Sequence, residues 1–304
     1  MKILLLCLGL ASPVIGFADE PASPKRVLVF SKSAGYEHAI VYRDTAWPSF
    51  LEREMLKIGI RHNIDFIFSK DGSLFTPENI ATFDAFLFYT SGDLTHQPRD
   101  GQGDNYPLMT LEGKNALLKA IQDGKGFIGV HSAVATFPRS SSTSFQDSPA
   151  IDPYHEMLGA QFIGHNREQN GPLILVDRKF PGMEAVPPDF AAFDEWPAMK
   201  NFAQDLHVIA VLDCREMTGN LYQRPNFPVV WARMENKGRV FFTAMGHDEE
   251  IWKNSIFRQM LVGGVQWATG QIDADVTPNI KTATPHASEI PLTALKVIHS
   301  PALK

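Results

Sequence analysis

The sequence is 304 residues long, with 28 basic and 34 acidic residues and a formal net charge of −6 at pH 7. A chain of this size buries roughly three quarters of the surface that its unfolded form exposes, so small cystine-rich scaffolds are excluded. The 44% apolar content and the 21 phenylalanines exclude an intrinsically disordered chain. No basic stripe alternates with aromatic residues, so we expect no nucleic-acid partner.

The N-terminus has the pattern of an export signal. Lys2 supplies a positive n-region, residues 3–10 form an apolar h-region, and residues 16–18 place small side chains at positions −3 and −1 of a cleavage site. We expect residues 1–18 to be a signal peptide and the protein to be exported, either periplasmic or secreted. A buried strand or a short membrane anchor is the alternative. The apolar stretch is too short and interrupted to span a bilayer, so we expect no stable membrane insertion.

The sequence contains two cysteines, Cys7 and Cys214. Cys7 lies in the h-region. A lipidated cysteine is expected to follow a small residue, but three leucines precede Cys7, so we do not expect a lipoprotein. Removal of the signal leaves Cys214 without a partner in the chain. We therefore predict no disulfide and a buried, small apolar role for Cys214.

Short apolar runs alternate with helix-period segments in the first half of the chain. The sequence predicts strands at 26–30, 64–68, 85–89 and 127–130 and a polar loop at 31–38. It also predicts a helix over 47–58 and a second helix that opens at Thr110 and ends just before Gly124. Continuous apolar strands between helices favour a parallel sheet that is covered on both faces. We therefore predict a doubly wound α/β unit.

The second half continues the same unit. It adds predicted strands at 173–176, 208–212, 229–231 and 240–243 and a final helix from about Glu250 to Ala268. Nothing marks a linker, so we expect one domain over residues 25–270. Residues 271–304 hold four prolines and no aromatic residue. They are predicted to be an arm over the surface or a disordered tail.

Ligands of open α/β sheets bind beyond the carboxyl ends of the strands. Residues 129–133, Gly-Val-His-Ser-Ala, follow one such strand. They resemble a nucleophile elbow, in which a sharp turn pushes one side chain out over the sheet. His131 occupies the elbow position and can act as an acid, a base or a metal ligand. Two alternatives stay open: Ser132 as a nucleophile, and His131 as a strand-end histidine bonded to backbone.

A second signal, the run from Gly246 to Glu249, follows the strand at 240–243. His247 and Glu249 could form a base and its orienting carboxylate, as in a catalytic triad. With the elbow, this layout matches class I glutamine amidotransferases, which need a cysteine at the elbow. Cys214 follows a different apolar run, so we expect no glutaminase activity.

Several ordered segments together resemble the ThuA-like (trehalose-utilisation) family. The resemblance covers about Lys25 to Gly270 and includes FSKSAGYEHA, GFIGVHSAVATF, YHEMLGAQFIGHN, FDEWPAMKNF and GRVFFTAMGHDEEIW. It implies a flavodoxin-like, doubly wound, mostly parallel sheet that is similar to the fold of class I glutamine amidotransferases. Glu37 departs from the basic residue expected before the histidine of the first loop, which argues against an anion contact there.

The resemblance implies carbohydrate metabolism in which a sugar is oxidised to a keto form and then processed. Enolisation or β-elimination of a 3-keto-glycoside needs a base, an acid and a group that polarises the carbonyl. We expect a His-rich cleft to supply these roles for elimination, hydrolysis or isomerisation. The expected catalytic residues are His131, His165, Glu195 and His247. The three histidines could equally hold a divalent metal, and no other cofactor is expected.

A small-molecule carbohydrate is the expected partner. The residues expected to bind it are Tyr36, His38, Thr90, Asp93, Tyr154, Asp194 and Trp196. Tyr36 and Trp196 could stack on a sugar ring, although a core position is the alternative for either. Likewise, His165 could cap a loop, and Asp194 with Glu195 could cap a turn or a helix. The alternative function is a non-catalytic module that binds a sugar or a partner in the same cleft, and a homo-oligomer stays open.

Overall fold

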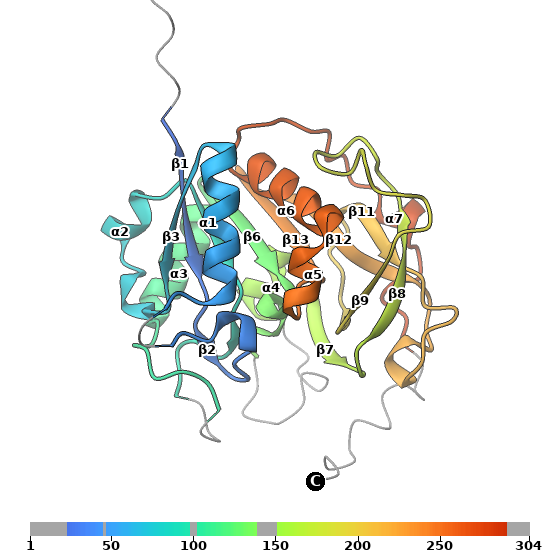
Figure 1. Cartoon of the computed structure of the whole chain (residues 1–304), viewed down its shortest axis with the longest axis horizontal. Coiled ribbons are helices and arrows are strands. Elements are labelled where there is room, and N and C mark those ends of the chain that lie inside the picture. Colours follow the sequence, from blue (N-terminus) through green and yellow to red (C-terminus); the bar gives the residue numbers. More distant parts are fainter. Residues whose placement is uncertain (1–22, 45–46, 98–101, 139–150, 291–304) are drawn as a thin grey trace, which may run out of the picture.

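The computed structural model describes residues 23–44, 47–97, 102–138 and 151–290. A nine-stranded sheet forms its centre, with the order β3-β1-β4-β6-β13-β12-β11-β8-β9 (Figure 1). The strands are β1 (Lys25–Phe30), β3 (Ile64–Ser69), β4 (Ala85–Phe88), β6 (Gly126–Val130), β8 (Gln169–Leu175), β9 (Ala191–Asp194), β11 (His207–Leu212), β12 (Phe227–Glu235) and β13 (Gly238–Thr243). Two small sheets pair β2 (Ser33–Ala34) with β5 (Ser91–Gly92) and β7 (Gln161–His165) with β10 (Pro197–Lys200).

The strands β3, β1, β4, β6 and β13 are parallel. Numbered along the chain, these five strands run 2-1-3-4-5, which is the flavodoxin order. They are buried along most of their length because helices cover both faces. The predicted flavodoxin-like, doubly wound α/β fold is confirmed.

The other four strands of the large sheet, β12, β11, β8 and β9, are antiparallel to their neighbours. A two-residue turn at Asn236 and Lys237 joins β12 to β13, and Asn236 adopts a φ of 52°. So short a connection allows only an antiparallel pair. The sequence predicted strands here but not their antiparallel direction, because β11 and β12 are buried on both faces and read like parallel strands.

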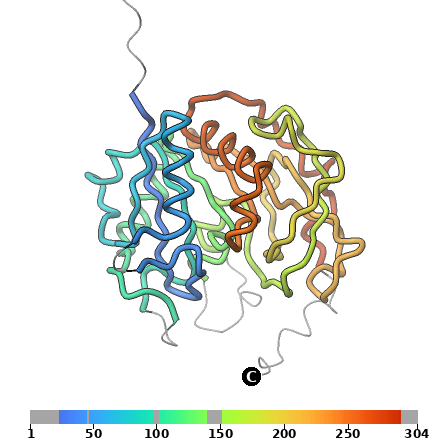
Figure 2. The backbone as a smooth tube through the Cα atoms, in the orientation of Figure 1, coloured from blue at the N-terminus to red at the C-terminus, as the bar shows by residue number. Residues whose placement is uncertain are grey.

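Helices α1 and α6 lie on one face of the sheet, and α3 and α4 lie on the other (Figures 1 and 2). The helices are α1 (Phe50–His62), α2 (Pro77–Ala81), α3 (Leu111–Gln122), α4 (Pro153–Leu158), α5 (Glu249–Lys253), α6 (Ser255–Ala268) and α7 (Ile280–Ala283). The short 3-10 turns are η1 (Ala39–Val41), η2 (Gly72–Leu74), η3 (His131–Ala135) and η4 (Asn220–Tyr222).

Two predicted helices differ from the observed ones. Helix α1 begins at Phe50 because Ser49 and Glu52 form a capping box, and Trp47, expected on its buried stripe, is 71% exposed. The predicted last helix is two helices. Asn254 breaks it with an extended backbone, and its side chain caps the first turn of α6.

After α6 the chain crosses to the antiparallel half, as Figure 2 shows, and α7 packs near β11. Asn279 accepts a hydrogen bond from the Val208 amide at 2.6 Å, and the Arg224 guanidinium donates to the Ala287 carbonyl. Residues 271–290 are thus an arm over the surface. The predicted signal peptide and residues 291–304 lie outside the described residues. Among those described, no helix has both the length and the apolar character needed to cross a membrane.

Candidate functional site

The elbow at His131 starts the site. His131 follows β6 with a φ of 48°, a left-handed conformation that costs a non-glycine residue free energy and is concentrated at functional sites. Its Nδ1 lies 2.9 Å from the Ala244 carbonyl oxygen. That oxygen can only accept, so Nδ1 carries the hydrogen and Nε2 keeps a lone pair in the neutral ring.

His247 follows β13, the parallel neighbour of β6, and is held through its backbone. The carboxylate of Asp194 accepts hydrogen bonds from the Gly246 amide at 2.8 Å and from the His247 amide at 3.1 Å. The Nδ1 atom of His247 lies 3.2 Å from His131 Nε2. The ends of two neighbouring strands thus bring two imidazole rings within hydrogen-bond distance of each other.

A carboxylate does orient His247, but it is not the predicted one. Glu249 lies at the start of α5, where its carboxylate pairs with Lys253 at 3.5 Å. Instead, Glu168 Oε1 lies 3.0 Å from His247 Nε2. Glu168 comes from the turn between β7 and β8, and no motif around it in the sequence marked it.

Glu195 lies between the histidines, in the connection from β9 to β10. Its Oε2 atom is 3.7 Å from His131 Nε2 and 3.6 Å from His247 Nδ1, and its Oε1 atom is 2.9 Å from His165 Nδ1. Burial acts to raise the pKa of Glu195, but the neighbouring His131 and His165 outweigh it and lower the pKa. Glu195 is therefore an anion.

The hydrogen-bond partners fix which atoms face the centre. Because the Glu168 carboxylate accepts from His247 Nε2, the lone pair of a neutral His247 lies on Nδ1. Burial, and then His131, lowers the pKa of His247 and favours that neutral ring. When both rings are neutral, two imidazole lone pairs and the Glu195 carboxylate converge with no hydrogen between them. This arrangement calls for a shared cation, either a proton or a metal ion.

The three converging atoms fit a metal ion. The nearest point equidistant from them lies about 2.0 Å from each, within the range of about 2.0–2.2 Å for zinc bonds to nitrogen and oxygen. His38 is the fourth member of the group, whose ligand atoms all lie within 4.8 Å of one another. Burial, and then His131 and His247, lowers the pKa of His38 to about 2, so its ring is neutral, as a ligand must be.

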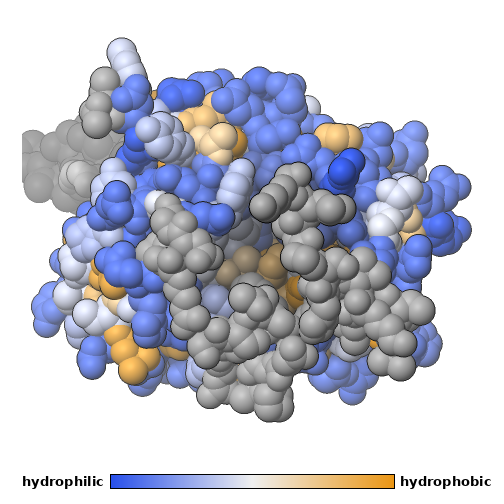
Figure 3. Space-filling view, turned by 90° about the horizontal axis from the view of Figure 1, so that it is seen from below, coloured by the Kyte–Doolittle hydropathy of each residue, from blue (hydrophilic) through white to orange (hydrophobic). Residues whose placement is uncertain are grey.

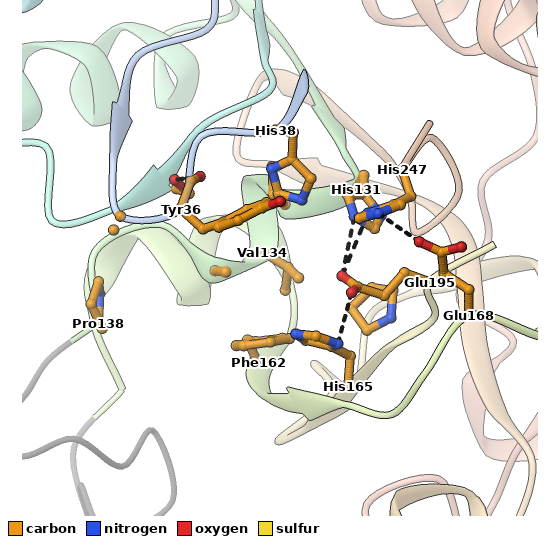
Figure 4. Close-up of a pocket in the computed structure, with 16 residues that line it drawn as sticks. Tyr36, His38, His131, Val134, Pro138, Phe162, His165, Glu168, Glu195 and His247 are labelled. Atoms are coloured by element: carbon orange, nitrogen blue, oxygen red, sulfur yellow. Dashed lines mark hydrogen bonds and ion pairs between the residues drawn. The ribbon is translucent and has the colours of Figure 1, made fainter. Parts of the chain in front are cut away.

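The group opens into a cavity of about 600 Å³ (Figure 4). The cavity lies at the carboxyl ends of the parallel strands, the face seen in Figure 3. Its lining comprises Gly35, Tyr36, His38, Ser91, Gly92, His131, Ser132, Val134, Ala135, Pro138, Phe162, His165, Glu168, Glu195, Pro197 and His247. All four predicted catalytic residues therefore face one cavity. For the metal, the geometry groups His38 and Glu195 with His131 and His247, and it leaves His165 behind Glu195.

Five of the residues expected to bind substrate are not among those that line the cavity. Trp196 and Tyr154 are fully buried, and their polar atoms donate to the carbonyls of Gln169 and Ala133. Both have core positions, which was the alternative for Trp196. Asp194 is buried against backbone amides, and burial raises its pKa to about 6.

The remaining two residues support loops. The Thr90 hydroxyl lies 2.7 Å from that of Thr136 and is buried. Asp93 accepts from the Thr95 amide in a local turn. Of the seven residues, only Tyr36 and His38 line the cavity.

Cys214 follows β11 and does not line the cavity. It is 4% exposed, and burial raises the pKa of its thiol to about 12. Its buried role is as predicted, and a thiol in this state is a poor nucleophile.

The parallel order of the sheet and the polar elbow after its fourth strand define a class I glutamine amidotransferase-like fold with histidine at the elbow. Residues 26–268 match the family model ThuA, described as trehalose utilisation. The chain belongs to this family, whose description indicates carbohydrate metabolism.

Solved structures share the fold. A ThuA-like protein of Bacteroides uniformis has a TM-score of 0.60 and 16% identity, over 83% of this chain and 94% of that one. A ThuA-like protein of Parabacteroides merdae has a TM-score of 0.57 and 16% identity, over 86% and 97%. A cytoplasmic protein of Salmonella typhimurium LT2 has a TM-score of 0.51 and 13% identity, over 82% and 100%. The comparison with curated proteins gives no significant match.

Proposed function

We propose that the protein is an exported enzyme that acts on a sugar or ketosugar in the cavity beside His131. One observation carries the proposal: His131 Nε2, His247 Nδ1 and Glu195 Oε2 lie within 3.7 Å of one another. The other ring nitrogen of each histidine has its own acceptor, the Ala244 carbonyl for His131 and the Glu168 carboxylate for His247. Such outer hydrogen bonds are typical of histidines that bind metals. The export part rests on the N-terminal sequence pattern alone.

His131, His247 and Glu195 would hold a divalent ion, with His38 beside them. When bound, the ion would polarise a carbonyl or two neighbouring oxygens of the sugar. The chain itself fixes the donor atoms through Ala244, Glu168 and the backbone, so little reorganisation is needed.

His165 is the proposed proton carrier. Its Nδ1–H donates to Glu195, which leaves Nε2 as the second ring nitrogen of a side chain that is 46% exposed at the cavity. Burial acts to lower the pKa of His165, but the bond with Glu195 outweighs it and raises the pKa. His165 can therefore take the proton from the carbon beside a ketosugar carbonyl and hold it. In an elimination, the electron pair left on that carbon forms the new double bond as the glycosidic C–O bond breaks. The departing aglycone oxygen takes the proton back from His165 and leaves as an alcohol, so His165 is the base and then the acid.

The test combines metal analysis of the purified protein with turnover of 3-keto-glucosides. His131→Ala and His247→Ala should each lose bound metal and reduce turnover by at least about 100-fold. His286→Ala is the matched control, because His286 pairs with Glu289 on the arm. Full activity in both site variants would overturn the assignment. A wild type that binds sugars but converts no ketosugar would instead favour the non-catalytic module.

A further inference from the structure

The cavity has two chemically different ends. Histidines and carboxylates occupy the end described above. The other end is lined by Tyr36, Val134, Pro138 and Phe162 (Figure 4). Figure 4 shows Tyr36 and Phe162 on opposite sides of the cavity with Val134 between them.

The two aromatic rings are held by the same histidines that build the polar end. The Tyr36 ring lies edge-on to His38 with centroids 5.0 Å apart, and the Phe162 ring lies nearly parallel to His165 at 6.4 Å. Tyr36 remains 62% exposed, so a large aromatic surface faces the solvent. A ligand that extends from the polar end would cover it.

Hydrogen-bonding side chains are scarce at the apolar end. Among the described lining residues there is no Asp, Asn, Gln, Lys or Arg, and the only hydroxyls besides Tyr36 belong to Ser91 and Ser132. The Ser91 hydroxyl already donates to the Tyr36 carbonyl at 2.7 Å. The Ser132 hydroxyl is buried and has no hydrogen-bond partner among the described residues. A second sugar ring would lose water from several hydroxyls and find few partners, which is unfavourable.

We infer that the substrates are glycosides with an aromatic or similarly apolar aglycone, which packs between Tyr36 and Phe162 while the sugar occupies the histidine end. The inference rests on the proposed function for the position of the sugar. A flat aryl ring matches two aromatic walls and needs no hydrogen bonds. A disaccharide such as trehalose matches this end less well, because its second ring is polar.

The test compares 4-nitrophenyl 3-keto-glucosides, in both anomers, with 3-keto-trehalose and methyl 3-keto-glucosides. We expect kcat/KM for the better aryl anomer to exceed that for the other two by at least about tenfold. Tyr36→Ala and Phe162→Ala should each reduce this preference for aryl substrates about tenfold. Phe162→Leu should retain the fold and lose part of the preference. Ile60→Ala is the control, since Ile60 is 86% exposed on α1.

A binding measurement separates this inference from the proposed function. Calorimetry with unoxidised 4-nitrophenyl and methyl glucosides should show tighter binding of the aryl compound, and Phe162→Ala should remove the difference. If no ketosugar is converted but this difference is found, the catalytic proposal fails and the aromatic subsite stands. Equal turnover of 3-keto-trehalose and aryl substrates, with no effect of either alanine variant on the preference, would overturn the subsite.

Discussion

The parallel and antiparallel halves of the sheet contribute different chemistry to one cavity. The parallel strands β1, β6 and β13 lead into His38, His131 and His247. The antiparallel half and its small neighbouring sheet contribute Glu168, Glu195 and also His165. Neutral ligands thus come mainly from one half and negative charge from the other. The site exists only where the two halves meet.

Removing the charge that the antiparallel half supplies should have the largest effect. Glu195→Gln keeps the side-chain shape but removes the anion that faces His131 and His247. We expect metal affinity and ketosugar turnover to fall at least about 100-fold. Metal content and kcat/KM measure the loss. Glu249→Gln is the matched control, since Glu249 pairs with Lys253 outside the cavity; equal losses in both variants would contradict the assignment.

In the parallel half, His155 supports the elbow that carries His131, and this support should make the free energy of unfolding depend on pH. His155, from α4, lies 3.0 Å from the Val134 carbonyl through Nε2, and burial lowers its pKa from 6.5 to about 4. Between pH 6.5 and about pH 4, His155 therefore binds a proton in the unfolded chain but not in the folded one. Stability is full above about pH 6.5 and falls as the pH drops toward 4, by up to about 3 kcal/mol.

Urea unfolding at pH 7.5 and pH 4.5 measures how much the free energy of unfolding falls between these two pH values. His155→Gln can keep a donor for the Val134 carbonyl but has no group that titrates. The free energy of unfolding of this variant should therefore fall less than that of the wild type. An equal fall in both proteins would show that other groups control the acid sensitivity.

The smallest expected effect comes from Glu168, the partly exposed carboxylate that the antiparallel half places beside His247. Glu168→Gln leaves a hydrogen-bonding group beside His247 Nε2 but removes its charge, and the side chain is 41% exposed. We expect about a tenfold loss of metal affinity, as for other residues that orient a metal-binding histidine. Competition with a chelator measures it. A loss as large as that of Glu195→Gln would place Glu168 among the direct ligands.

The sequence predicted the histidines better than the carboxylates, for a physical reason. His131 and His247 follow buried strands of a parallel sheet, and the carboxyl ends of such strands meet at one edge. Glu168 and Glu195 instead lie in connections between short antiparallel strands, whose pairing depends on contacts distant in the sequence. Family resemblance alone pointed to Glu195.

Burial limited the prediction of substrate contacts in a similar way. From the sequence, Trp196 is expected to stack on a sugar ring and Tyr154 to bind the substrate, but both side chains are 0% exposed. Phe162, which does line the cavity, lies in a segment that carries the family resemblance but is not among the residues expected to bind the substrate. The side of a short strand that faces a cavity is set by its pairing register, and one residue of shift reverses it.

The Asp194 carboxylate accepts hydrogen bonds from the amides of Glu195, Gly246 and His247. One side chain therefore ties together the backbones that carry two of the converging ligand atoms. Their spacing is fixed when the protein folds, before any ion arrives. Ion uptake should consequently be a local event, with a small change in heat capacity and with amide exchange altered only around the two connections that Asp194 links.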